Sequence, residues 1–262
     1  MKVLVIGAGK MTSAILEGFK GQEDLSQWEI FSPTGVSAKK LAESVGAKWR
    51  EDLNHLEGFD YVLLGCKPQQ LGDFGKDHGD KIKAFPVLSM LAAISEEDQR
   101  AHLKVSKLVR IMPNMPVKFR KGVTLIASSS ASESLTHIQV LFQKIGNAYG
   151  MKESELEELT LLSGSGPAFF YEFSKNLADS FSSLSSNERE EISRAVLLGS
   201  GLMSSVEKKD LNTLIGEVTS KGGVTIAVLE KFRELDLKDL VLKGMQNGVK
   251  RTQELKELLR RK

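Results

Sequence analysis

A glycine-rich turn near the start of the chain carries the clearest chemical signal in the sequence. Gly7 and Gly9 lie between an apolar, β-branched run, Lys2–Ile6, and a segment with apolar residues at helical spacing, Met11–Phe19. In this order of strand, turn and helix, the first glycine permits the tight turn and the second lets the backbone approach a pyrophosphate. The helix N-terminus then offers free N–H groups to the phosphates, so the turn predicts a dinucleotide site. Thr12 stands where this pattern expects a third small residue.

The end of the second expected strand, Glu29–Ser32, bears on the choice of dinucleotide. An acidic side chain there would bind the ribose hydroxyls and favour NAD. This sequence instead places hydroxyl groups at Ser32 and Thr34, with Lys39 and Lys40 nearby. These groups suit a 2′-phosphate and favour NADP, although a simple turn would explain them as well.

Two further glycine-rich segments stand before expected helices, Ser163–Ala168 and Ser220–Thr225. Each can present bare backbone N–H groups at a helix N-terminus, an arrangement that suits a carboxylate. The alternative is that small residues let helices pack closely or simply end them. Two such segments behind a dinucleotide turn favour a small anionic substrate.

Several classes of function lack support in the sequence. The four histidines have no acid or cysteine at metal-ligand spacing, so we expect no metal site. The net charge is only +2, from 36 basic and 34 acidic residues, which argues against a nucleic-acid binder. No uncharged run approaches the roughly 20 apolar residues that span a membrane. The run Val3–Ile6 is too short for a signal peptide, and the single cysteine, Cys66, fits a reducing cytosol, so we expect a cytoplasmic protein.

Strands and helices alternate in the first half of the chain and helices fill the second. The expected strands are Lys2–Ile6, Glu29–Ser32, Asp60–Cys66, Phe85–Met90, Lys107–Ile111 and Val123–Ala127. This alternation predicts an α/β, Rossmann-like, doubly wound parallel sheet over residues 1–152. The expected helices beyond it are Leu156–Ser183, Asn187–Lys208, Leu211–Thr219, Thr225–Phe232 and Leu237–Leu259. Because these helices have several apolar faces, we expect residues 153–262 to form an all-α domain that pairs with a second chain.

Taken together, these motifs resemble the pyrroline-5-carboxylate reductase family along nearly the whole chain. The resemblance rests most specifically on a Lys-Pro-Gln segment, a Ser-Gly-Ser-Gly-Pro-Ala segment and a Gly-Gly-x-Thr segment that follow one another in this order. The segments that carry it are Gly7–Met11, Val62–Gln69, Ser89–Ile94, Arg110–Pro116, Leu162–Phe169 and Val218–Ile226.

The resemblance implies reduction of the cyclic imine 1-pyrroline-5-carboxylate to L-proline by NADPH, with NADH also open. It implies a homodimer whose sites use both chains, with a higher oligomer of such dimers also open. It implies that Thr225 is catalytic, its hydroxyl bonding the ring nitrogen. The implied substrate-binding residues are Ser163, Ser220, Gly222, Gly223, Val224 and Thr225. The implied cofactor-binding residues are Gly7, Gly9, Lys10, Met11, Ser32, Asp52, Cys66, Lys67, Pro68, Ala92 and Asn114.

Some positions depart from the family pattern and keep alternatives open. Thr12 replaces a small residue, Lys221 stands where proline is usual, and Val224 replaces a frequent threonine. Asp52 stands where an asparagine commonly contacts the ribose, and its charge would repel a 2′-phosphate. A related imine reductase with another substrate, and a non-catalytic NADP-binding regulatory protein, are the alternative interpretations. A β-hydroxyacid dehydrogenase is disfavoured, because Phe170 occupies the position of its catalytic lysine.

Overall fold

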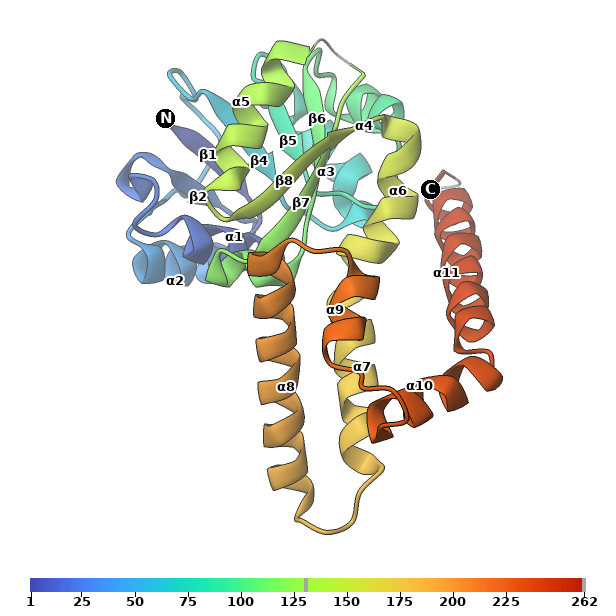
Figure 1. Cartoon of the computed structure of the whole chain (residues 1–262). Helices are drawn as coiled ribbons and strands as arrows, with labels where there is room; N and C mark the ends of the chain where they lie inside the picture. The colour runs from blue at the N-terminus through green and yellow to red at the C-terminus, as the bar shows by residue number, and fades with distance from the viewer. Residues whose placement is uncertain (130–131, 261–262) are drawn as a thin grey trace. The chain divides into compact units, whose positions relative to one another are not determined.

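The computed structural model describes residues 1–129 and 132–260, which fall into two compact units (Figure 1). One unit contains residues 1–165 together with the end of the last helix, from residue 249 onward. The other unit is Gly166–Gly248. The domain boundary after residue 152 follows the change from strands to helices rather than these contacts, and it stays a prediction.

An eight-stranded sheet forms the centre of the first unit, in the order β3-β2-β1-β4-β5-β6-β7-β8. Strands β1 to β6 run parallel to one another. All four residues of β1 are buried, as expected for a strand covered on both faces. The strands are β1 (Val3–Ile6), β2 (Glu29–Phe31), β3 (Lys48–Trp49), β4 (Tyr61–Leu64), β5 (Val87–Ser89), β6 (Leu108–Pro113), β7 (Gly122–Ala127) and β8 (Gly146–Met151).

Helices cover both faces of the sheet and separate its core into layers. On one face, apolar residues of α1 (Lys10–Phe19), α2 (Val36–Val45) and α5 (Ser132–Gln143) share a buried cluster with alternate residues of the strands. On the other face, α3 (Leu71–Ile82) and α4 (Glu96–Leu103) do the same. This arrangement confirms the doubly wound α/β fold. It leaves the carboxyl ends of the parallel strands as the edge where ligands bind in such sheets.

The sheet departs from the expected all-parallel form at β7, which pairs antiparallel with β6. The connection between them holds only a 3-10 helix, Met115–Phe119, and is too short for the crossover that a parallel pair requires. Strand β8 then pairs parallel with β7. It was not expected, because its sequence Gly-Asn-Ala-Tyr-Gly-Met is rich in residues that are depleted in strands.

The second unit is helical, as expected, but its first expected helix is divided. In place of Leu156–Ser183 there are α6 (Glu153–Ser163), which belongs to the first unit, and α7 (Gly166–Asp179). Pro167 has no N–H to continue the hydrogen-bond ladder to the Ser163 carbonyl four residues before it. The remaining helices are α8 (Ser186–Glu207), α9 (Leu211–Glu217), α10 (Val224–Glu234) and α11 (Leu237–Arg260).

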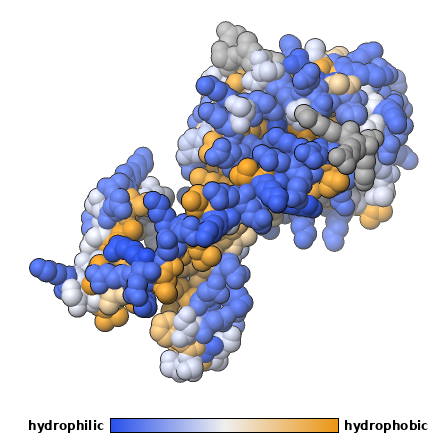
Figure 2. Space-filling model, turned by 90° about the vertical axis from the view of Figure 1, so that its right-hand side faces the viewer, coloured by the Kyte–Doolittle hydropathy of each residue, from blue (hydrophilic) through white to orange (hydrophobic). Residues whose placement is uncertain are grey.

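The helical unit leaves many large apolar side chains exposed, and Figure 2 shows hydrophobic residues at the surface of the helices in the lower part of the view. An apolar surface of this extent is typical of a protein–protein interface. The residues that are more than half exposed include Phe170, Leu198, Val206, Leu211, Val218 and Val224. Along residues 1–129 and 132–260, no helix combines the length and apolar character needed to cross a membrane.

Candidate functional site

The turn between β1 and α1 has the geometry of a phosphate cradle. Gly7 has a φ of +96°, and a Cβ atom there would lie 2.7 Å from the Gly65 carbonyl oxygen. Gly9 is the N-cap of α1, and no side chain caps this helix end. A Cβ atom on Gly9 would meet nothing within 4 Å. The N–H groups of the first turn of α1 therefore face open space, which fits a bound pyrophosphate.

Thr12 does not disturb this turn, because Gly65 on the neighbouring strand end makes room for it. Thr12 is 1% exposed, and a Cβ atom on Gly65 would lie only 2.5 Å from the Thr12 hydroxyl oxygen. The usual pattern has the small residue on the helix, at the position of Thr12. In this chain the small residue of the same contact is Gly65, at the end of the neighbouring strand. Close packing of helix against sheet is retained with the two residue sizes exchanged.

The predicted cofactor-binding residues lie beyond the carboxyl ends of the parallel strands. Because these strands are neighbours in one sheet, their ends share one edge. Direct bonds join adjacent ends, since the Gly7 N–H donates to Phe31 O at 2.8 Å and the Gly65 N–H to Ile6 O at 2.7 Å. In chain order, the residues at this edge are Gly7, Gly9, Lys10 and Met11 after β1, Ser32 after β2, Asp52 after β3, Cys66, Lys67 and Pro68 after β4, Ala92 after β5, and Asn114 after β6.

Beyond β2, the expected hydroxyl groups surround a tight turn. Ser32 is buried, and its hydroxyl oxygen lies 3.3 Å from that of Ser37. A Cβ atom on Gly35 would lie 3.6 Å from the indole of Trp49, and the Lys39 ammonium lies 5.8 Å from the centre of the same ring. The structure therefore gathers hydroxyls, a cation and an exposed aromatic face at this end of the edge.

Asp52 introduces the opposite charge at the same edge. The Asn54 backbone N–H donates to Asp52 Oδ1 at 2.8 Å and lowers the pKa of this carboxyl below its ordinary value. Asp52 is therefore ionised at neutral pH. Arg50 does not neutralise it by a direct ion pair, because its guanidinium pairs with Glu29 at 3.1 Å.

The segment after β4 contains an unreactive thiol and a short 3-10 helix. Burial raises the pKa of the Cys66 thiol to about 11, so the side chain stays protonated at neutral pH and is a poor nucleophile. The Lys67 backbone N–H donates to Gln70 Oε1 at 3.0 Å, and Pro68 begins a short 3-10 helix. These residues can shape a cofactor site without taking part in covalent chemistry.

Asn114 and Ser163 are brought together, although they are far apart in the sequence. The Asn114 amide donates to the Ser163 carbonyl oxygen at 2.8 Å, and its own oxygen accepts the Val123 N–H at 2.8 Å. This bond replaces the helical one that Pro167 cannot make. The Ser163 hydroxyl is buried and has no hydrogen-bond partner among the described residues. One predicted substrate residue therefore lies in direct contact with a predicted cofactor residue.

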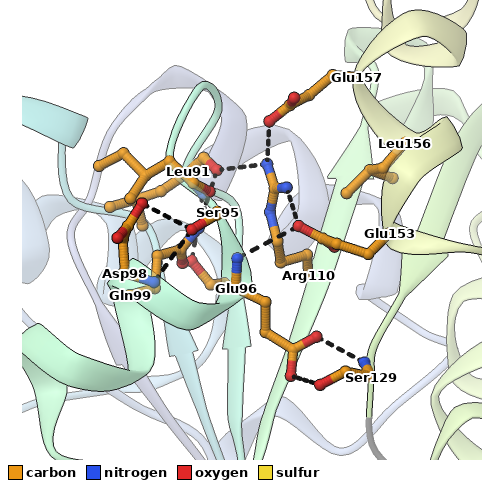
Figure 3. Close-up of polar contacts among 12 residues, drawn as sticks. Leu91, Ser95, Glu96, Asp98, Gln99, Arg110, Ser129, Glu153, Leu156 and Glu157 are labelled. Carbon is orange, nitrogen blue, oxygen red and sulfur yellow. Dashed lines mark hydrogen bonds and ion pairs between the residues drawn. The ribbon is translucent and has the colours of Figure 1, made fainter. Parts of the chain in front are cut away.

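A buried arginine on β6 was not predicted to have a role at this site. Arg110 is bonded to Glu153 and Glu157 of α6 and to the Leu91 carbonyl, as Figure 3 shows. The signal for it was a charged residue in the middle of the otherwise apolar run Leu108–Pro113. A charge in such a strand must be paired, but the sequence does not identify the partners, which lie more than forty residues away along the chain.

The other predicted substrate residues form a second glycine-rich cradle in the helical unit. Gly222 has a φ of +70°, and Gly223 is the N-cap of α10 without a side-chain capping bond. A Cβ atom on Gly223 would lie 2.3 Å from the Ser220 hydroxyl oxygen. Val224 and Thr225 follow in the first turn, and both are exposed. The segment can present free N–H groups and the Thr225 hydroxyl to a small anion.

The structure thus collects the predicted cofactor residues and Ser163 in the first unit. It places Ser220, Gly222, Gly223, Val224 and Thr225 together in the second unit. Each unit thus contains one helix N-terminus that begins after a glycine, at Gly9 and at Gly223.

The chain is similar to known proteins along almost its whole length. Residues 153–255 match the family model described as pyrroline-5-carboxylate reductase dimerisation. A pyrroline-5-carboxylate reductase of Staphylococcus epidermidis is 30% identical over 269 residues, which cover 97% of this chain and 98% of that protein. The structure of a pyrroline-5-carboxylate reductase from Coxiella burnetii has a TM-score of 0.89 at 22% identity, covering 97% of this chain and 98% of that one. That of a Plasmodium falciparum pyrroline carboxylate reductase with NADP bound has a TM-score of 0.81 at 18% identity, covering 98% of each chain.

These similarities bear on different levels of the description. The two structures support the fold, in which a Rossmann-like sheet is followed by helices. The Staphylococcus relative extends over nearly all of both chains and supports common family membership. The chain belongs to the pyrroline-5-carboxylate reductase family and is an NAD(P)H-dependent oxidoreductase that acts on an imine.

Proposed function

We propose that this protein reduces 1-pyrroline-5-carboxylate to L-proline in the cytoplasm, with NADPH as the preferred hydride donor. The observation that carries the proposal is the open, uncapped N-terminus of α1 at the edge of the sheet, in a chain that aligns along 97% of its length with a named reductase of this imine. The NADP-bound relative supports a nicotinamide cofactor.

The first unit would hold the cofactor by its pyrophosphate and by the 2′-phosphate of its adenine half. The α1 N-terminus would bind the pyrophosphate, because its dipole and free N–H groups favour negative charge. The group around Ser32 and Lys39 would receive a 2′-phosphate, and this is the basis of the preference for NADPH. The ionised Asp52 opposes that preference through its charge, and NADH would remain a weaker donor.

The second unit would hold the substrate. The N–H groups at the start of α10 would bind the carboxylate, while the Thr225 hydroxyl would hydrogen-bond the ring nitrogen. Lys221 is exposed two residues before the N-cap and adds positive charge to this segment. Together these groups would select a small cyclic imine that carries a carboxylate.

The reaction mainly requires the protein to orient the reduced nicotinamide and the imine relative to each other. The reduced nicotinamide supplies a hydride to the imine carbon, and the bound proton stays on the ring nitrogen of the product. A protonated imine is already a good hydride acceptor, so the protein mainly has to position the two reactants. A threonine hydroxyl can orient the nitrogen without a shifted pKa, and neither a histidine nor a metal ion is needed for that step.

A homodimer is part of the proposal. The match to the dimerisation model spans the whole helical unit, and this unit exposes many large apolar side chains. Burying them against a second copy would remove that surface from water, which stabilises association by about 25 cal/mol for each Å² of apolar area.

The test is the oxidation of NADPH and NADH by the purified protein with 1-pyrroline-5-carboxylate, followed by the absorbance of the reduced nicotinamide. We expect substrate-dependent oxidation that is faster with NADPH. Thr225→Val should lower turnover while cofactor affinity is retained. Thr225→Ser keeps the hydroxyl group and should retain most of the turnover of the parent. Tight cofactor binding with no turnover would instead favour another imine substrate or a non-catalytic binder, and a Thr225→Val enzyme as active as the parent would refute the role of this hydroxyl.

A further inference from the structure

Arg110 connects two segments that border the predicted nicotinamide position. Its side chain is 1% exposed. Nη1 lies 2.5 Å from Glu153 Oε1, and Nη2 lies 3.2 Å from Glu157 Oε1, so the guanidinium is paired with two carboxylates of α6. Nη2 also donates to the Leu91 carbonyl oxygen at 3.3 Å. One planar, rigid donor group therefore fixes the loop after β5 relative to α6 (Figure 3).

The loop that Arg110 holds has an unfavourable backbone conformation. Ala93 has a φ of +61°, in the left-handed region, which is unfavourable for a non-glycine residue. Such a conformation persists where the surroundings impose it. Here two buried side chains do so, because Gln99 Nε2 donates to the Ile94 carbonyl at 2.8 Å and Arg110 donates to Leu91. Between these anchors, Ala92 remains exposed to a ligand.

The helix that Arg110 holds is fastened at its other end by the residue that follows the same strand. Asn114, four residues after Arg110, bonds the carbonyl of Ser163 at the last residue of α6. At the first turn, Glu153 Oε1 also accepts the Glu96 N–H at 3.2 Å. Both ends of α6 are thus tied to the chain that follows β5 and to β6, and its C-terminal end carries a predicted substrate residue.

Stability alone does not account for a charge at this position. A buried ion pair recovers its desolvation cost only with excellent geometry, and apolar residues of similar volume often stabilise such a site as well or better. An apolar residue at position 110 would leave the Leu91 carbonyl and the two carboxylates without their common donor. The particular contribution of arginine is the fixed geometry between them.

We propose that Arg110 is a positioning residue, which sets the distance between the Ala92 loop and the Ser163 end of α6 and thereby the placement of the nicotinamide ring against the imine. The proposal rests on the proposed function, in which Ala92 and Asn114 lie toward the nicotinamide. The adenine half of the cofactor would bind elsewhere along the edge of the sheet. Substitution of Arg110 would therefore leave the affinity for this half unchanged.

The experiment compares the full-length variants Arg110→Lys and Arg110→Met with Arg100→Met as the matched control. Arg100 lies on α4 and pairs with Glu96 at 3.2 Å, so its loss perturbs the same polar cluster without touching Leu91 or α6. Circular dichroism first establishes that each variant is folded. Affinities are then measured for NADPH and for 2′,5′-ADP, which represents the adenine half alone. Turnover of 1-pyrroline-5-carboxylate is followed with NADPH and with its C4-deuterated form.

We expect Arg110→Lys to lower kcat by about 100-fold, because displacements near 1 Å in a reactive pair have effects of this size. The deuterium isotope effect on kcat should rise, since hydride transfer becomes slower relative to the other steps. Affinity for 2′,5′-ADP should stay within about twofold of the parent, and Arg100→Met should resemble the parent in every kinetic measurement. A folded Arg110→Lys enzyme with unchanged kcat and isotope effect would overturn the proposal, however much its melting temperature falls.

Two further measurements apply if the Arg110 variants do not fold or if the parent protein does not reduce the imine. If both Arg110 variants fail to fold, Glu157→Gln weakens the same contact more gently, and it should lower kcat and raise the isotope effect in the same direction; an unchanged kcat would overturn the proposal. If the parent protein reduces no imine, the proposed function fails. The ratio of NADPH affinity to 2′,5′-ADP affinity then tests Arg110 separately. A fall of about fivefold or more in the variant supports the positioning role, and an unchanged ratio overturns it.

Discussion

The two glycine cradles of this chain have nearly the same backbone angles at the helix start but differ in how deeply the first helical turn is buried. Gly9 before α1 has φ and ψ of −80° and 176°, and Gly223 before α10 has −81° and 174°. In the first cradle the helix packs on the sheet, with Thr12 buried against Gly65. In the second, Val224 is 84% exposed. The start of α1 is thus partly enclosed by the sheet of its own unit, whereas Val224 at the start of α10 lies open.

The reason for glycine also differs between the two positions. A side chain at Gly9 would enter the open space where a phosphate would lie, whereas a side chain at Gly223 would collide with Ser220 of its own loop. The first glycine thus serves the approach of a ligand and the second serves the shape of the cradle. Substitutions at the two positions should consequently fail for different reasons.

Gly9→Val should have the largest effect. Its side chain would occupy the space in front of the α1 N-terminus, and we expect NADPH affinity to fall by at least about 100-fold. The fold should survive, because no other atom lies within 4 Å of the new Cβ position. Isothermal calorimetry of NADPH binding measures the effect, with Gly72→Ala as a control at another glycine that has open space around it. Parent-like affinity in Gly9→Val would refute the phosphate cradle.

Gly223→Ala should impair the substrate side alone. The added Cβ would lie 2.3 Å from the Ser220 hydroxyl oxygen and would distort the start of α10. We expect kcat/KM for the imine to fall by about 10-fold or more while NADPH affinity is unchanged. The double variant Ser220→Gly with Gly223→Ala removes the colliding hydroxyl and should recover part of the cradle geometry. If Gly223→Ala weakened NADPH binding as strongly as imine binding, the assignment of the cofactor to one cradle and of the substrate to the other would be wrong.

Gly65→Ala tests how Thr12 is accommodated in the cofactor cradle. The new Cβ would lie 2.5 Å from the Thr12 hydroxyl oxygen and 2.8 Å from Met90 Cε, and overpacking of this kind costs about 1–3 kcal/mol of unfolding free energy. Thr12→Gly in the same chain should recover part of this loss, because it removes the nearer of the two contacts. Denaturant unfolding of the two single variants and the double variant measures the coupling. Strictly additive losses would show that Thr12 and Gly65 do not compensate each other.

The smallest effect is expected from pH, and it concerns the first unit. All four histidines lie in the first unit and residues 166–248 contain none. The ring of His78 packs against Phe31 and Phe74, and burial lowers its pKa below the ordinary value of 6.5, with the nearby Lys81 lowering it further. The unfolded chain then binds a proton at a higher pH than the folded chain, so stability should decline as the pH falls below about 6.5.

Unfolding free energies between about pH 7 and pH 5 measure this slope. His78→Phe should flatten this slope, because it removes the imidazole whose pKa burial lowers. An equal slope in the parent and in His78→Phe would contradict the assignment to this histidine.

Local sequence signals accounted for much of the fold and of the cofactor edge. The buried run before Gly7 and the helical spacing after it define the first strand, turn and helix without long-range information. The antiparallel β7 and the edge strand β8 depend on a short connection and on pairing with a distant strand, so periodicity could not predict them. The same limit applies to Arg110, whose partners Glu153 and Glu157 are fixed by packing. The exchange of sizes between Thr12 and Gly65 could be recognised only once the two residues were seen in contact.

The most direct test of the proposed function is a transfer experiment with NADPH in which deuterium replaces both hydrogens at C4. The purified full-length protein is incubated with this cofactor and 1-pyrroline-5-carboxylate, and the product is analysed by mass spectrometry and NMR. We expect the parent to form L-proline with a single deuterium at C5, and we expect Gly9→Val to form none. NADPH binding without deuterated proline would contradict the proposed function.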